Sequence, residues 1–266
     1  MKDVNKYIDI IYKFADEMKY KHNKHFLGIY FYGSSYTGFN NDYSDVDIHV
    51  VFDNSDPLHI YRGVHYIDGH KIEYFEKCIG DLYLSVDNDI KERNIAWFSM
   101  LANSKILFDK TGKLKELQEY TKKAYKNGLP KLDEQDALEY VAIINNRMEK
   151  LKTLCIDDGE NFYHLYQITI EKIRRFYHSL NGFPKINTSK IYKIYKNDAY
   201  RKSYYNGNFV SDKFKDMYFE LITLQETNKT KLYDKLNDFY AYVKNGLALP
   251  NGNYKIKIKS RNIKPT

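Results

Sequence analysis

The sequence predicts an α+β protein, in which a mixed sheet flanked by helices is followed by an all-α helical bundle. Short apolar runs typical of strands are confined to about the first 115 residues. After Pro130 the strand signals nearly vanish, and long amphipathic runs take their place. We therefore expect a first domain over residues 1–115, a helical domain over 125–247 and a basic tail over 248–266.

The first domain is expected to begin with a helix over residues 3–20, where apolar residues recur at helical spacing and Asp3 is a suitable N-cap. The run FLGIYFYG predicts a buried strand, SSYTGFNNDYS a loop and DVDIHVVFD a second strand. The run HYIDGHKIEYFEK predicts two strands joined at Asp68-Gly69. Residues 81–105 are expected to be mostly helical, and KILFD to be the last strand.

The second domain is expected to consist of long helices. Residues 133–155 and 160–182 each carry one amphipathic pattern, and the second ends with Gly182, a good C-cap position, and Pro184 just beyond. Residues 212–246 supply two more helices. The predicted architecture is therefore a bundle.

Composition narrows the ligand class only slightly. The net charge of +7 and the pI of about 8.9 suit an anionic ligand such as a nucleotide or RNA, but they are also common in lysine-rich proteins without one. Cys78 and Cys155 lack metal-ligand spacing, so ordinary reduced thiols are expected. The sequence shows neither a signal-peptide core nor a long apolar run, which predicts a cytoplasmic protein without a membrane partner.

One array of residues predicts chemistry. Gly33-Ser34 follows the first strand, ten residues intervene, and Asp45-Val46-Asp47 opens the second strand. Residues i and i+2 of a strand share a face, so the two carboxylates point the same way and repel each other unless a cation lies between them. Carboxylate oxygens at this spacing suit Mg²⁺. A strand whose acids simply face solvent is disfavoured by the apolar residues that alternate with them.

This array resembles the signature of the polymerase-beta-like nucleotidyltransferase superfamily, and the Ser44-Asp45 junction fits that signature as well. The resemblance implies a third acid in the middle of a neighbouring strand. Glu73 fits this position better than Glu76, which lies on the opposite face. The alternative for Glu73 is an exposed strand glutamate paired with a lysine.

The resemblance assigns roles to these residues. Asp45, Asp47 and Glu73 would be catalytic and hold two Mg²⁺ ions, which orient the triphosphate and activate the acceptor hydroxyl. The nucleotide would contact a second set of residues: Gly33, Ser34 and Ser44.

The implied reaction transfers a nucleoside monophosphate from a triphosphate, with ATP the expected donor, to a hydroxyl group. The helical half loosely resembles the aminoglycoside and lincosamide branch, which favours a small-molecule acceptor. An antibiotic-resistance role would rest on analogy of fold alone. A protein or tRNA acceptor, as in toxin-antitoxin or defence members, and a non-catalytic nucleotide-binding protein remain alternatives.

In that branch, a helical-domain carboxylate can act as general base and a basic residue can reach the triphosphate. The candidates for these roles are Asp136, Glu139, Arg147, Lys150, Arg174, Arg175 and Lys190. For each of them a solvated helix face is the favoured interpretation. Trp97 is expected in the core, with base stacking as the alternative.

Overall fold

The computed structural model describes residues 7–22, 24–39, 44–53, 60–156, 160–245 and 247. The chain divides into two compact units, Met1–Pro130 with Pro184–Asn208, and Lys131–Phe183 with Phe209–Thr266. The first unit extends to residue 130, beyond the expected domain end at 115. It also includes residues 184–208, which were expected in the helical domain. The expected N-cap Asp3 and the tail over 248–266 lie outside the described residues.

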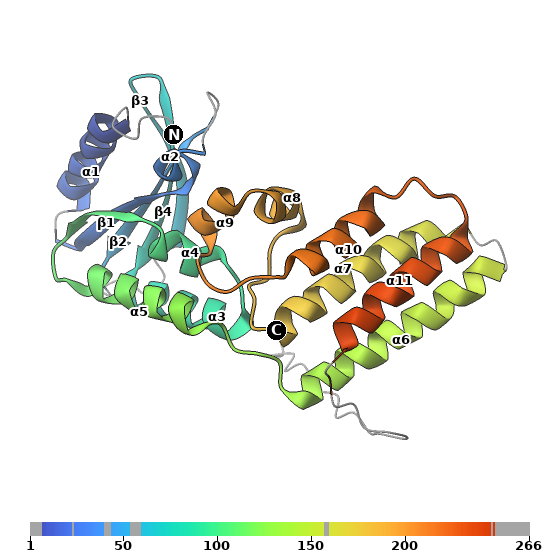
Figure 1. Cartoon of the computed structure of the whole chain (residues 1–266). Coiled ribbons are helices and arrows are strands. Elements are labelled where there is room, and N and C mark those ends of the chain that lie inside the picture. The colour runs from blue at the N-terminus through green and yellow to red at the C-terminus, as the bar shows by residue number, and fades with distance from the viewer. Residues whose placement is uncertain are drawn as a thin grey trace, which may run out of the picture. The chain divides into compact units, whose positions relative to one another are not determined.

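A five-stranded sheet forms the centre of the first unit (Figure 1). Its strands are β1 (Phe26–Tyr32), β2 (Val46–Phe52), β3 (Ile60–Ile67), β4 (His70–Cys78) and β5 (Lys105–Asp109). They lie in the order β3-β4-β2-β1-β5, where β2 and β4 are parallel and the other neighbours antiparallel. The predicted mixed sheet is confirmed.

Burial follows the position of each strand. The residues of β1 are all buried, whereas β3 is mostly exposed at the sheet edge. The β3–β4 hairpin turns at Asp68 and Gly69, whose φ angles of 49° and 78° are the pair that a tight primed turn requires. The predicted turn is confirmed.

Helices cover both faces of this sheet (Figure 1). Helix α1 (Ile8–His22) packs on one face through residues such as Ile11 and Phe14. The other face is covered by α3 (Ile79–Glu92), α4 (Ala96–Ala102) and α5 (Lys113–Asn127). The helical stretch expected over 81–105 is interrupted after α3, where Arg93 takes a left-handed φ of 60°.

The expected loop after β1 begins instead as a short helix, α2 (Gly33–Thr37). The Thr37 hydroxyl donates to the Gly33 carbonyl at 3.0 Å, and the helix ends at Gly38 with a φ of 76°. The loop prediction is therefore wrong for these residues, because side-chain bonding of this kind closes a local helical turn.

Two further helices belong to the first unit although they come late in the chain. They are α8 (Thr188–Lys196) and α9 (Asp198–Tyr204). Asn187 and Asn197 precede them, and each accepts a hydrogen bond from a backbone N–H of the helix it caps.

The second unit has helices and connecting loops, and no strand, among its described residues. It contains α6 (Glu134–Ile156), α7 (Phe162–Leu180), α10 (Asp212–Thr223) and α11 (Lys229–Lys244). Their apolar faces form the unit's core, which includes Ile144, Ile173, Phe176, Phe214 and Phe239. The predicted fold class is therefore confirmed. No helix in the described ranges is long and apolar enough to cross a bilayer.

Candidate active site

The acids of the predicted motif lie side by side on one face of the sheet. Asp45 directly precedes β2, and Asp47 is the register partner of Glu73 on the parallel strand β4. Glu76 lies three residues further on, so its side chain projects from the opposite face, where the residue is buried. The structure therefore brings Asp45, Asp47 and Glu73 together, and we refer to them as the carboxylate cluster.

The pKa of Asp47 is raised within this cluster. Burial raises the pKa of its carboxyl to about 7, and the charges of Asp45 and Glu73 act in the same direction. The positive charges of Lys190 and Arg62 oppose this rise. The ionised form of Asp47 is therefore destabilised at this position.

Two basic side chains contact the carboxylate cluster: Lys71 at Glu73 and Asp45, and Arg62 at Glu73. Lys71 Nζ donates to Glu73 Oε1 at 2.5 Å and to Asp45 Oδ2 at 3.4 Å. Arg62 donates to Glu73 Oε2 at 2.8 Å. Hydrogen bonds from Lys71 and then from Arg62 lower the pKa of Glu73 to about 2, so this acid is ionised. Lys71 shares a strand face with Glu73, so the alternative in which Glu73 pairs with a lysine describes this contact, whereas sequence reasoning did not assign Arg62 to the site.

Gly33 makes room for the carboxylate cluster. Its φ of +82° is left-handed, and a Cβ atom at this position would lie 2.0 Å from Asp47 Oδ2. The sequence argument expected Gly33 to let a phosphate approach the backbone. The structure shows that the missing side chain also accommodates the Asp47 carboxylate.

Ser35, which sequence reasoning missed, fixes the start of β2. Its hydroxyl donates to the Asp45 carbonyl at 2.6 Å, and the residue is 1% exposed. This bond joins α2 to the residue that carries the first acid. The only signal for it was the second serine after Gly33.

A cavity of about 240 Å³ opens beside Asp47 within the first unit. Gly33 and Ser34, two of the residues expected to contact the nucleotide, line it, whereas Ser44 does not belong to its described lining. Lys190 also lines it, so this candidate of the sequence argument lies at the site. The remaining lining residues come from β1, α2, α4 and α9, and sequence reasoning did not assign them to the site: Tyr32, Thr37, Ser99, Met100, Asn103, Ser203 and Tyr204.

Tyr32 presents an unsatisfied donor to this region. It is the register partner of Asp47 on β1 and is 4% exposed, and its hydroxyl has no hydrogen-bond partner among the described residues. Burial raises the pKa of this phenol, and the neighbouring charges of Asp47 and Glu73 raise it further. The hydroxyl therefore keeps its proton and can donate to an anionic or water ligand.

The donor set fits Mg²⁺ in chemistry, although the side chains are not yet arranged around an ion. No three His, Cys, Asp or Glu side chains in the described ranges are placed as ligands of one metal. Lys71 and Arg62 occupy the Glu73 oxygens instead. Carboxylate oxygens suit a hard divalent cation, and such a cation would neutralise the charges of Asp45 and Glu73 that act on Asp47.

Of the candidates in the helical unit for a general base or a phosphate contact, Arg147 and Arg174 make hydrogen bonds within that unit. Arg147 donates to the Ile168 carbonyl at 3.0 Å, which joins α6 to α7. Glu139 and Lys150 also lie on α6, and their roles stay predictions. Arg174, for which a solvated helix face was the favoured interpretation, is instead fully buried and donates to Glu171.

Trp97 packs where it was expected. Its ring lies 4.9 Å from that of His49, with Lys77 Nζ 4.1 Å from its centre. It belongs to the packing between α4 and the sheet, below the carboxylate cluster.

Comparison with known proteins identifies the family of this chain. No curated protein matches the chain. Among solved structures, a nucleotidyltransferase-like protein from Exiguobacterium sibiricum is similar, with 12% identity and a TM-score of 0.48 over 86% of this chain and 73% of that chain. A family model described as a nucleotidyltransferase domain matches residues 11–191, a range that contains the carboxylate cluster and Lys190. The chain therefore belongs to the nucleotidyltransferase domain family, whose general chemistry is the transfer of a nucleoside monophosphate.

Proposed function

We propose that this protein transfers a nucleoside monophosphate, with ATP as the expected donor, to a hydroxyl of a small molecule, in a reaction that needs two Mg²⁺ ions. The observation that carries the proposal is the carboxylate cluster beside a cavity lined by Gly33, Ser34 and Lys190. Oxygen ligands and a cationic side chain at one cavity suit a triphosphate and its metals.

The proposed role of each residue follows from where it lies around the cavity. Asp45, Asp47 and Glu73 would hold the metal ions, which supply charge neutralisation and activation of the acceptor hydroxyl. Lys190 adds a positive charge at the phosphates, because its charge already acts on the Asp47 carboxylate. The acceptor oxygen bonds to the α-phosphorus and loses its proton, while the bond from that phosphorus to pyrophosphate breaks.

The geometry argues against a non-catalytic relative. A protein that only kept the fold would not need a buried acid at Asp47 beside two further acids, since burial and those charges destabilise its ionised form. Here Glu73 lies directly beside Asp47 in register, on the same face. This arrangement supports a catalytic role over nucleotide binding alone.

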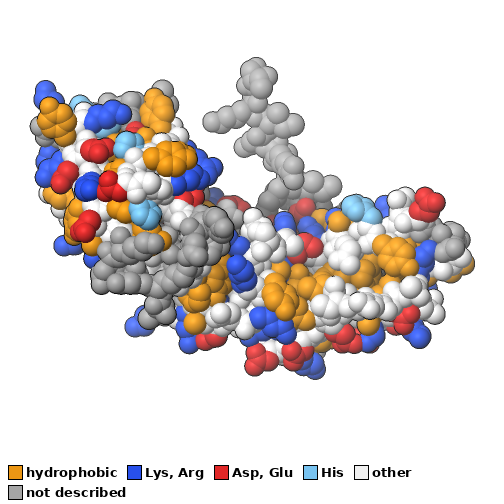
Figure 2. Space-filling model, turned by 90° about the horizontal axis from the view of Figure 1, so that it is seen from above, with side chains coloured by type: hydrophobic (Ala, Val, Ile, Leu, Met, Phe, Trp, Pro, Cys, Tyr) orange, Lys and Arg blue, Asp and Glu red, His pale blue; other side chains and the backbone are white. Residues whose placement is uncertain are grey.

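The proposed acceptor is inferred from the architecture of the second unit and from the distribution of surface charge. The second unit is a helical body of the kind expected for the aminoglycoside and lincosamide branch, which favours a small molecule. A large polyanion such as tRNA would be favoured by a continuous basic surface. Figure 2 instead shows Lys and Arg side chains interspersed with Asp and Glu over the visible face. We therefore keep the small molecule as the proposed acceptor and tRNA or protein as alternatives.

The test supplies α-labelled ATP, GTP, CTP and UTP with Mg²⁺ to the purified protein. Acceptors are pooled aminoglycosides and lincosamides, total tRNA and cell-extract protein, each assayed separately. We expect label on a small molecule, with ATP the best donor. Label on tRNA or protein alone would overturn the acceptor assignment and leave the transferase assignment standing.

Two variants show whether the label comes from this site. Asp45→Ala/Asp47→Ala should abolish transfer, because it removes the metal ligands. Asp53→Asn is the matched control, since Asp53 follows the far end of β2, where it pairs with His25 at 3.3 Å. Transfer that survives the double substitution would refute the proposed site.

A further inference from the structure

The last residue of α9 is held by two side chains from distant parts of the sequence. Asn103 Nδ2 donates to the Tyr204 carbonyl at 3.1 Å across 101 residues, and the Tyr125 hydroxyl donates to the same carbonyl at 2.6 Å across 79 residues. Asn103 Nδ2 also donates to the Tyr125 hydroxyl at 2.8 Å. These three residues form a closed triangle of hydrogen bonds, which we call the Tyr204 anchor.

The Tyr204 anchor satisfies a group that the helix itself leaves open. Carbonyl groups in the last turn of a helix have no partner within the helix, and Tyr204 is the final residue of α9. A carbonyl can only accept, so the side-chain amide of Asn103 must present its NH₂ group to it. Tyr125 is 7% exposed, so this bonding is largely shielded from water.

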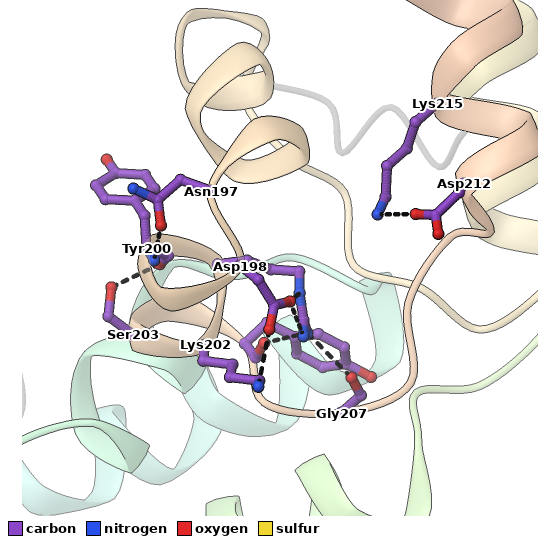
Figure 3. A network of polar contacts seen from close by, with 10 residues as sticks. Asn197, Asp198, Tyr200, Lys202, Ser203, Gly207, Asp212 and Lys215 are labelled. Carbon is purple, nitrogen blue, oxygen red and sulfur yellow. Dashed lines mark hydrogen bonds and ion pairs between the residues drawn. The ribbon is translucent and has the colours of Figure 1, made fainter.

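Hydrogen bonds and an ion pair within residues 197–207 also stabilise α9 (Figure 3). Asn197 Oδ1 accepts from the Tyr200 N–H at 2.9 Å, and Asp198 pairs with Lys202 at 2.8 Å. Arg201 donates to the Gly207 carbonyl at 3.3 Å. The anchor therefore fixes the backbone of Tyr204 at the end of α9, and the Tyr200 hydroxyl, which donates to the Tyr204 hydroxyl at 3.3 Å, holds its ring.

That ring positions the cation at the cavity. Lys190 Nζ lies 4.6 Å from the centre of the Tyr204 ring, and both residues line the cavity beside Asp47. A ring face attracts an ammonium group without consuming its N–H donors. All three donors of Lys190 therefore stay available for phosphate oxygens.

We propose that Asn103 and Tyr125 are positioning residues, which act through Tyr204 to hold Lys190 where the triphosphate binds. This inference rests on the proposed function, because it needs a nucleotide in the cavity. It assigns to α4 and α5 a role in nucleotide affinity that the sequence motif does not contain.

The test measures binding of a non-hydrolysable ATP analogue with Mg²⁺ to four proteins: the wild type, Tyr125→Phe, Lys190→Met and the double variant. Loss of the two anchor hydrogen bonds that the Tyr125 hydroxyl makes should weaken binding about 3- to 10-fold in Tyr125→Phe. In the Lys190→Met background the same substitution should have almost no effect, because the cation that it positions is already gone. Asn103→Ala should reproduce the pattern of Tyr125→Phe.

Tyr120→Phe is the matched control. Tyr120 lies on the same helix as Tyr125, and its hydroxyl donates to Asp87 at 2.9 Å instead of to α9. This variant should bind the analogue like the wild type. Equal weakening by Tyr125→Phe with and without Lys190 would overturn the inference, because a merely structural role predicts additive effects. Unchanged binding in both Tyr125→Phe and Asn103→Ala would overturn it as well.

Failure of the proposed function gives a different result. If the wild type binds no nucleoside triphosphate, the cavity is not a nucleotide site, and the proposed function and this inference fall together. If the wild type binds the analogue and the two positioning variants match it, only the inference fails.

Discussion

Each of the two units contains buried carboxylate charge, and each handles it differently. In the helical unit, burial by itself would raise the pKa of Glu171, but hydrogen bonds from Arg174 and Arg175 bring the pKa below its ordinary value. Both arginines lie on α7 with it, three and four residues on. In the sheet unit, Asp47 is surrounded by further acids, and its pKa is raised to about 7.

The difference separates a structural charge from one held for a ligand. Glu171 is neutralised by its own helix, so it needs nothing from outside the chain. Asp47 keeps an unfavourable interaction that only a bound cation or a proton relieves, and such retained cost is typical of functional sites. The predictions below test this contrast, from the largest expected effect to the smallest.

Asp47→Asn should abolish transfer, lowering turnover by more than about 1,000-fold, because the carboxylate is the central ligand of the proposed metals. The fold should survive, since the amide is isosteric and removes a repulsion. Labelled-nucleotide transfer and circular dichroism measure the two results. Wild-type turnover in this variant would sink the metal-site assignment.

Glu171→Leu should have the opposite profile. It leaves the fully buried Arg174 without its carboxylate, which should lower the free energy of unfolding by about 3 kcal/mol. Urea denaturation measures the loss, and Glu149→Leu at an exposed position of α6 is the control. The folded fraction should still bind nucleotide normally. A stability equal to that of the control would mean that the Glu171 pairing contributes little.

Glu73→Gln and Glu76→Gln test which acid of β4 belongs to the site. Glu73 is the register partner of Asp47, so its substitution should lower turnover about 100-fold. Glu76 pairs in register with Val50, away from the cavity, so its substitution should change turnover by less than about threefold. Comparable losses in both variants would contradict the assignment from strand register.

The pH dependence of stability without metal should report Asp47 directly. Its folded pKa lies above its unfolded value, so the folded state binds more protons between about pH 4 and 7, and stability falls as pH rises through this range. In chelator, Asp47→Asn should therefore gain about 1–2 kcal/mol relative to wild type between pH 5 and pH 8. Thermal melts across pH measure this, and a gain that does not depend on pH would refute it. Mg²⁺ should reduce the gain by stabilising only the wild type.

The sequence predicted much of the site because its signals are local. The two acids one residue apart, the preceding Gly33-Ser34 and the alternation along β2 and β4 all concern neighbours in the chain. The same holds for the Asp68-Gly69 turn, since its φ angles depend on those two residues. Glu73 could be preferred to Glu76 because side chains alternate along a strand.

Other features depend on contacts between distant segments, which local patterns do not contain. Lys190 was one of several basic candidates, and it was distinguished only when residues 184–208 packed with the sheet unit. Arg174 looked equally suitable in the sequence, but packing buries it against Glu171.

The sequence by itself determined the order of the strands, the carboxylate motif and the face on which its acids lie, because strand alternation and turn geometry are properties of adjacent residues. Only the tertiary structure decided the cavity lining, the cations that hold Glu73 and the Tyr204 anchor. The anchor, for example, depends on a side chain that lies 101 residues away in the sequence from the carbonyl it contacts, which packing decides and local periodicity does not encode.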